Sequence, residues 1–313
     1  MTESPVQETE HEIRIAAPPD AVFTALADAP GWPAVFPPSV HVEQLERTGS
    51  TERIRIWATA NGSPRTWTSR RELDERARHI SFRQEVSASP VAAMGGAWIV
   101  EETDAGGSRV RLTHDFRAVD DDPASVEWIH QAVDRNSEAE LASLRAALER
   151  PDGTAPTTFE DTVLVRGRAQ DVYDFLYQAD LWQERLSHVA RITVKEEDPG
   201  LQHLSMETRT ADGSVHLTTS VRVCFAERHV IVYKQLRTPP LLSLHLGRWS
   251  IRPSGDAVAV TSAHTVSVVP SAIPEVLGEG ATEADAVKYA RKALGRNSLL
   301  TLDAARRYAE SRA

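Results

Sequence analysis

Hydrophobic residues in the first half of the chain recur mostly at every second position, and later at every third or fourth. Residues 11–16 alternate weakly, and Pro18-Pro19-Asp20 then opens a short helix that ends at Ala27, since proline is tolerated in a first turn. Six further runs bounded by turn residues predict an antiparallel sheet. These predicted strands are 40–47, 53–60, 65–73, 79–86, 97–102 and 109–119.

An apolar stripe with helical spacing predicts a long helix after the last of these strands. Its members are Val126, Ile129, Val133, Ser137, Leu141, Leu144 and Leu148. The serine in the centre of the stripe follows Asn136. A buried hydroxyl is costly without a hydrogen-bond partner. Either this serine is hydrogen-bonded within the core, or this face of the helix lines a partly polar cavity.

The second half of the chain repeats the first at an offset close to 150 residues. Trp32 matches Trp182 and His114 matches His264, while Asn136-Ser137 recurs as Asn297-Ser298 after about eleven extra residues. We therefore predict two copies of one domain, residues 1–150 and 157–313, joined by a linker at 151–156 that is rich in Pro, Gly and Asp. Each copy is long enough to bury its own core.

Composition narrows the class of protein. Hydrophobic residues make up 41% and charged residues 26%, as in globular proteins, and no apolar run approaches the roughly 18 residues of a membrane span. One cysteine, Cys224, and an acidic start without an apolar segment are typical of a cytoplasmic protein. The net charge of -10 disfavours general nucleic-acid binding.

The usual catalytic signatures are absent from the sequence. There is no P-loop, no glycine fingerprint for dinucleotides, no H-E-x-x-H, no G-x-S-x-G and no convincing set of metal ligands. We expect either chemistry without a cofactor or metal, or plain ligand binding.

An arginine on an apolar strand face is the most informative sign of chemistry. Side chains two positions apart share a face, so Trp67, Ser69 and Arg71 point the same way. Either a carboxylate elsewhere in the fold pairs with Arg71, or its permanently charged guanidinium points into a pocket and binds a carbonyl or enolate oxygen. His114 also lies on an apolar face, as a satisfied core histidine or a catalytic one.

Other aromatic residues suit the wall of a pocket. Trp32 and Phe36 flank a proline-rich loop that suits a rim or lid, and Trp98 follows Gly95-Gly96, a pair typical of a strand bend or a close backbone approach.

The motif Trp67-x-Ser69-x-Arg71, with Trp32 upstream and Asn136-Ser137 on the last helix, resembles the aromatase/cyclases of bacterial type II polyketide synthases. The duplication resembles their di-domain members. The resemblance implies an α+β fold of two tandem helix-grip (START/Bet v 1-like) domains. Each would be an antiparallel sheet curled around a long C-terminal helix, with an internal cavity.

The resemblance also implies a reaction and its partners. An aldol condensation and loss of water would close and aromatise the first ring, C7–C12, of a ketoreduced poly-β-ketone on an acyl carrier protein, without a cofactor. Arg71 and Ser69 would be catalytic. Substrate-binding residues would be Trp32, Trp67, Phe36, Trp98, His114, Asn136 and Ser137. Other synthase components are expected partners. The sequence leaves two arrangements open, an intramolecular pseudo-dimer of the two domains or further dimerisation of the chain.

The second copy departs from the motif, because Thr218 stands where a tryptophan is expected. If Arg222 points inward, the opposite face with Val221 and Val223 is expected to pack on the other domain or another subunit. If it points outward, the second site is lost. We expect the first domain to carry the main site and the second to be structural or auxiliary. The candidate residues of the second domain are Arg222, Ser220, Trp182, Trp249, His264 and Asn297.

Two other functions stay open at the level of sequence. One is a non-enzymatic carrier of a hydrophobic small molecule, and the other is a scaffold for synthase components. An inward arginine favours an enzyme. An acidic carrier protein would need a basic docking patch, for which the candidates are Arg65, Arg70, Arg76, Arg78 and Arg83.

Overall fold

The computed structural model of the chain describes residues 6–104, 106–150, 155–209 and 213–313. The chain divides into two compact units, Met1–Asp152 and Gly153–Ala313, which are described separately. Residues 151–154 of the predicted linker lie outside the described residues.

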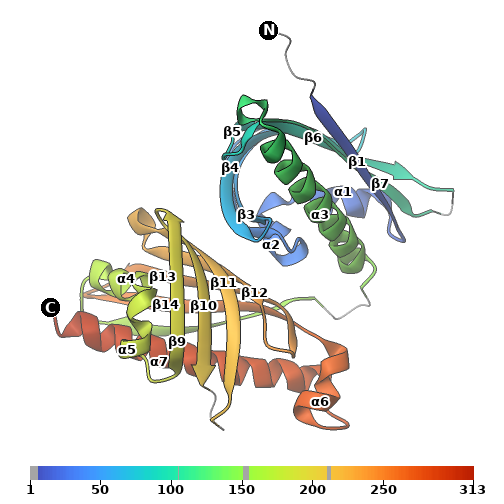
Figure 1. Ribbon diagram of the computed structural model, residues 1–313. Coiled ribbons are helices and arrows are strands. Elements are labelled where there is room, and N and C mark those ends of the chain that lie inside the picture. The colour runs from blue at the N-terminus through green and yellow to red at the C-terminus, as the bar shows by residue number, and fades with distance from the viewer. Residues whose placement is uncertain (1–5, 105, 151–154, 210–212) are drawn as a thin grey trace. The chain divides into compact units, whose positions relative to one another are not determined.

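The first unit is a single curved sheet around one long helix (Figure 1). Its strands follow the order β1-β7-β6-β5-β4-β3-β2, and all neighbours are antiparallel. In chain order the elements are β1 (Gln7–Ile15), α1 (Pro19–Ala27), η1 (Ala29–Gly31), α2 (Trp32–Val35), β2 (Ser39–Thr48), β3 (Thr51–Ala60), β4 (Ser63–Asp74), β5 (His79–Val86), β6 (Val91–Glu102), β7 (Ser108–Ala118), η2 (Val119–Asp121) and α3 (Pro123–Leu148).

The helix α3 packs against the inner face of this sheet, as its apolar stripe predicts. Ile129, Ser137 and Leu144 of the stripe are buried, and the helix contacts β1 and β7. Asp122 caps its first turn by accepting a hydrogen bond from the Ser125 backbone at 2.8 Å. The long helix therefore forms one wall of whatever space the sheet encloses.

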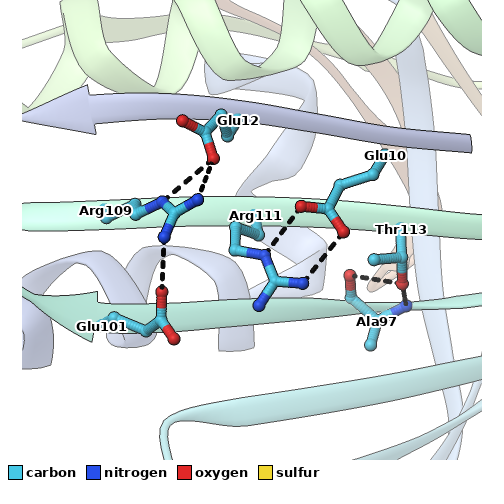
Figure 2. Close-up of polar contacts among 7 residues, drawn as sticks. All are labelled: Glu10, Glu12, Ala97, Glu101, Arg109, Arg111 and Thr113. Atoms are coloured by element: carbon cyan, nitrogen blue, oxygen red, sulfur yellow. Dashed lines mark hydrogen bonds and ion pairs between the residues drawn. The ribbon is translucent and has the colours of Figure 1, made fainter.

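Strand β7 shows how alternation sorts side chains between the two faces. Arg109 and Arg111 point outward and pair with carboxylates on β1 and β6 (Figure 2). Such exposed ion pairs contribute little to stability. Leu112 and His114, at the alternate positions, face inward, and burial of this face fixes the strand's register.

Strand β6 begins six residues earlier than predicted, at Val91, because the Gly95-Gly96 pair continues the strand. A Cβ on Gly96 would lie 1.9 Å from the carbonyl oxygen of Thr113. The predicted close backbone approach is confirmed. On β4, Thr68 alternates with the inward Trp67 and Ser69, a position that predicts a solvated side chain. It is buried instead, with its register partners Arg55 and Val86 on either side of it.

The second unit repeats this architecture, with strand order β8-β14-β13-β12-β11-β10-β9. Its elements are β8 (Thr157–Val165), α4 (Ala169–Tyr177), η3 (Ala179–Leu181), α5 (Trp182–Arg185), β9 (Val189–Asp198), β10 (Leu201–Arg209), β11 (Val215–Phe225), η4 (Ala226–Arg228), β12 (Val230–Arg237), β13 (Leu242–Ser254), β14 (Ala257–Val268), η5 (Pro270–Ala272), α6 (Ile273–Leu277) and α7 (Glu283–Glu310). The extra residues before the last helix include η5 and α6, and Thr282 forms a capping box at the start of α7.

The strand registers of the two units are equivalent. Gly96 pairs with His114 between β6 and β7, and Gly247 pairs with His264 between β13 and β14. Glu52 opposes Arg71, and Gln202 opposes Arg222. Residues at matching positions can therefore be compared directly. None of the helices in the described ranges is long and apolar enough to cross a membrane.

Candidate functional site

Two adjoining hollows lie between the inner face of the first sheet and α3. The helix hollow, of about 140 Å³, is lined by Asn136 and Ser137 of α3. The arginine hollow, of about 100 Å³, is lined by Ser69 and Arg71 of β4. The two hollows have several lining residues in common, among them Trp32, Trp67 and His114. All nine candidate residues of the first domain line one or both hollows: Arg71, Ser69, Trp32, Trp67, Phe36, Trp98, His114, Asn136 and Ser137.

Arg71 both pairs with a carboxylate and lines the cavity, so the two possibilities weighed from the sequence hold together. Its side chain is 2% exposed, and its Nε lies 3.3 Å from Oε1 of Glu52 on β3. Its Nη2 donates to the carbonyl of Leu26 at 2.9 Å, and its Cζ lies 4.8 Å from the centre of the Trp32 ring. These contacts hold the guanidinium in one orientation.

The charge state of Arg71 follows from this environment. Burial lowers its pKa to about 10, and the Glu52 carboxylate opposes that effect. Arg71 therefore stays protonated near neutral pH. Its Nη1 has no hydrogen-bond partner within the residues that the structure describes. A buried donor of this kind favours a ligand oxygen in the arginine hollow.

Glu52 is the residue of this site that the sequence interpretation missed. It is buried, and Gln44 donates to its other carboxylate oxygen at 2.5 Å. The signal was present, because Glu52 alternates with Ile54 and Ile56 and so shares their inward face. The alternation alone does not reveal that this face meets Arg71.

His114 lines both hollows as a neutral imidazole. Burial lowers its pKa to about 4. Its ring lies edge-on to Phe82, with the ring centres 5.5 Å apart. Among the described residues its Nδ1 has no partner, so His114 is not a fully satisfied core histidine. It offers one hydrogen bond to a bound molecule.

Aromatic rings form the apolar wall of the arginine hollow. Phe36 lies between Trp32 and Trp98, with ring centres 5.6 Å and 6.0 Å apart. On α3, the amide of Asn136 donates to the carbonyl of Thr59 at 3.1 Å, which leaves the side-chain oxygen of Asn136 for a ligand.

The second domain holds one larger cavity, of about 300 Å³. All six candidate residues line it: Arg222, Ser220, Trp182, Trp249, His264 and Asn297. Arg222 points inward, where its Nη2 donates to the carbonyl of Leu176 at 2.6 Å. Val221 and Val223 on the opposite face are buried too, and the partner of that face stays a prediction.

The sequence interpretation also missed polar residues of the second cavity. His264 bonds to His245 of β13 at 2.9 Å and to Ser298 of α7 at 2.7 Å. Tyr233 and Ser262 complete this buried group. Ser298 was visible in the sequence as the repeat of Ser137, whereas the position of His245 holds Met94 in the first copy and so gave no signal.

Two helix-grip domains, each with a cavity and a buried arginine between its sheet and its long helix, define a START-like fold. Comparison with known families narrows this class. Residues 6–149 and residues 165–288 each match a family described as polyketide cyclase/dehydrase and lipid transport. The chain belongs to the polyketide cyclase/dehydrase family, carries two copies of its domain, and is a polyketide cyclase/dehydratase.

Individual relatives share the whole arrangement. The chain is 47% identical to the granaticin polyketide synthase bifunctional cyclase/dehydratase of Streptomyces violaceoruber, covering 95% of this chain and 92% of the relative. It is 45% identical to the actinorhodin polyketide synthase bifunctional cyclase/dehydratase of Streptomyces coelicolor, covering 93% of both.

Solved structures give the same result. The di-domain ARO/CYC BexL of the BE-7585A biosynthetic pathway matches with a TM-score of 0.85 and 50% identity over 97% of this chain and 99% of BexL. StfQ of the steffimycin pathway, also a di-domain ARO/CYC, matches with a TM-score of 0.83 and 35% identity over 97% of this chain and 99% of StfQ. The predicted α+β fold of two tandem helix-grip domains is confirmed.

Proposed function

We propose that the first-domain cavity binds a ketoreduced poly-β-ketone and closes and aromatises its first ring between C7 and C12. The names of the relatives, which are polyketide synthase cyclase/dehydratases, support this reaction class. The observation that carries the proposal is the Arg71 guanidinium, which is protonated, buried, oriented by three protein groups, and has an unpartnered Nη1 in the arginine hollow.

The chemistry needs a positive charge at the place where an oxygen becomes negative. Removal of a proton from the carbon between two ketones gives an enolate, and Arg71 donates to its oxygen. The enolate carbon attacks a distant ketone carbon of the same chain, a C–C bond forms as the C=O π bond of that ketone breaks, and the resulting alkoxide accepts a proton. Ser69 is buried beside Arg71 on the same strand face, where its hydroxyl can donate and accept in this transfer.

Loss of water completes the aromatic ring. The C–O bond of the new alcohol breaks, a proton leaves the adjacent carbon, and the oxygen departs as water. Neutral His114 hydrogen-bonds a ketone or enol oxygen of the chain and fixes its position relative to Arg71.

The walls of the cavity set which carbons meet. A flexible chain gains most from being held in one folded conformation, because its two reacting carbons then stay close together. Trp32, Trp67 and Trp98 present flat apolar surfaces that suit a planar product rich in oxygen. Cyclisation without these walls would yield several shunt products.

The acyl carrier protein is the proposed source of the substrate, alongside other synthase components in the cytoplasm. Arg65 supports this, because it lines the helix hollow and lies 5.9 Å from the Trp128 ring centre. Three other arginines of the candidate patch form ion pairs on the surface: Arg70 with Glu85, Arg78 with Asp20 and Arg83 with Asp115. We propose Arg65 for carrier-protein contact because its side chain lines the helix hollow.

The test is reconstitution with a minimal polyketide synthase and a ketoreductase, comparing Arg71→Ala with Arg109→Ala. Arg109 points outward from β7, pairs with Glu12 and Glu101 and lies outside the candidate docking patch, so it is a matched control. Wild type and Arg109→Ala should direct the products to one aromatic first ring. Arg71→Ala should lower that product by roughly a hundredfold or more, as loss of one oxyanion donor does. Equal products from all three proteins would refute the proposal.

A further inference from the structure

Four inward positions of the second cavity are more polar than their counterparts in the first. The equivalences follow from the matching strand registers. The second domain has Tyr233 where the first has Phe82, His245 where the first has Met94, Ser262 where the first has Leu112, and Thr218 where the first has Trp67. A domain kept only for its structural support would gain nothing from these changes, because each one places a polar group in a core.

Three of these residues belong to one continuous hydrogen-bond network. His264 Nδ1 bonds to His245 Nε2 at 2.9 Å and lies 3.4 Å from the Tyr233 hydroxyl. His264 Nε2 bonds to Ser298 Oγ at 2.7 Å, and Ser262 Oγ lies 3.2 Å from the same oxygen. In the first domain, by contrast, neither His114 Nδ1 nor Ser137 Oγ has a partner among the described residues.

The network ends at an atom that needs a ligand. His245 is 2% exposed and lines the cavity, and its Nδ1 has no partner in the described parts of the chain. Burial lowers the pKa of both histidines, so both are neutral at physiological pH. The free Nδ1 therefore donates or accepts one hydrogen bond, depending on the tautomer, and leaving it unpaired would be costly.

The second polar anchor of this cavity is Arg222, which is 3% exposed. It opposes Gln202, so the neighbouring strand supplies no carboxylate like Glu52 in the first domain. Within the described residues, its Nε and Nη1 have no hydrogen-bond partner. The carboxylate of Glu196 accepts from Gln202 at 2.7 Å and is also attracted by Arg222, but it makes no hydrogen bond to the two unpartnered nitrogens among the described residues. Arg222 thus keeps two donors that suit an acidic oxygen.

The size of the cavity restricts what carries that oxygen. A cavity of about 150 Å³ accommodates one benzene ring. The second-domain cavity, with a volume of about 300 Å³, therefore suits a fused two-ring system. Trp182, Trp249 and Leu204 supply apolar walls for its faces. Replacement of the bulky Trp67 by Thr218 accounts for part of the additional room.

We propose that the second-domain cavity is a ligand site in its own right, for a planar, ring-closed phenolic polyketide. The acidic hydroxyl of the ligand contacts Arg222, and its other oxygen bonds to His245. The identity of the ligand rests on the proposed function, whereas the existence of the site rests on the geometry of the second cavity.

The test is titration of the full chain with 1,3-dihydroxynaphthalene by calorimetry, with 1,3-dimethoxynaphthalene as the ligand control without acidic hydroxyls. The variants are Arg222→Gln and His245→Met, the latter giving the residue of the first domain. Arg71→Gln is the matched first-domain variant. We expect one molar equivalent of the dihydroxy probe to bind at the second-domain site. The affinity of this site should fall at least tenfold in Arg222→Gln and His245→Met and stay unchanged in Arg71→Gln. The dimethoxy probe should bind this site at least tenfold more weakly.

A second measurement keeps the proposal testable if His245→Met does not fold. In wild type labelled with ¹⁵N-histidine, the ring nitrogen resonances of His245 and His264 should move when the probe is added, and Arg222→Gln should weaken that response. Absence of such an equivalent, equal affinities in all variants, or unresponsive resonances would overturn the second site. Failure of the proposed function is detected by a different experiment, because Arg71→Ala would then give the same products as wild type in the reconstituted synthase.

Discussion

Glu52 and Arg71 lie opposite each other on β3 and β4, both buried, with 3.3 Å between Oε1 and Nε. The same register positions in the second domain hold Gln202 and Arg222. The first pair is neutral overall, whereas the second places a neutral amide opposite its arginine, and that amide donates to the Glu196 carboxylate at 2.7 Å. One substitution between the copies therefore removes the carboxylate from the position directly opposite the arginine.

Replacing Glu52 by Gln should destabilise the first domain by about 3 kcal/mol, because a buried charge loses its counter-ion. This cost lies at the lower end of the usual range for breaking a buried ion pair. The reason is that the second domain already accommodates a glutamine, Gln202, opposite its buried Arg222. The measurement is the free energy of unfolding in urea. Glu85→Gln, on the surface, is the control and should cost about 0.5 kcal/mol or less. Similar costs for both variants would contradict the importance of the buried pair.

The two central serines of α3 and α7 should respond differently to alanine. Ser298 Oγ bonds to His264 Nε2 at 2.7 Å and lies 3.2 Å from Ser262 Oγ, so Ser298→Ala should cost about 1–2 kcal/mol by removing two buried hydrogen bonds. Ser137 Oγ has no partner within the described residues, so Ser137→Ala should be nearly neutral. Thermal and urea unfolding of the two variants measure this difference. A larger loss from Ser137→Ala would show that the assignment of partners is wrong.

Trp67→Thr should give the first cavity the wider shape of the second. We expect the yield of the correct first ring to fall roughly ten- to a hundredfold in favour of shunt products, because the chain is held less closely. The product ratio from the reconstituted synthase is the readout. Thr66→Ala, at the adjacent position on the other strand face, should leave the ratio unchanged. An unaltered ratio for Trp67→Thr would exclude this wall from control of regiochemistry.

Stability should fall as the pH drops from about 6.5 to about 4. Burial lowers the pKa of His114 to about 4 in the folded protein, against 6.5 for the ordinary side chain, and also lowers the pKa of His245 and His264. In this range the unfolded chain binds protons that the folded chain does not, so the free energy of unfolding rises with pH.

His114 alone should account for about 2 kcal/mol between pH 7 and pH 5. The measurement is urea unfolding at both pH values, with His114→Gln as the matched variant. The variant should show a smaller loss on acidification. Identical pH dependence in the two proteins would mean that folding does not lower the pKa of His114.

The sequence by itself determined the elements and their repetition. Residues two apart on a strand must share a face, and steps of three and four must form one helical stripe, so Arg71 and Ser137 could be placed on inner faces from local order alone. The duplication needed only the recurrence of Trp32 as Trp182 and His114 as His264 at one offset. These features depend on neighbours along the chain, which a sequence displays directly.

Only the tertiary structure decided which inner side chains meet. Val221 and Arg222 are both buried, so alternation could not say which faces the cavity until the carbonyl of Leu176 was found beside the guanidinium. The partner of His264 on β13, His245, is nineteen positions away in the chain, and its equivalent in the first copy is Met94 rather than a histidine. Such contacts depend on register between strands and on the curvature of the sheet, which arise from packing of the whole domain rather than from local periodicity.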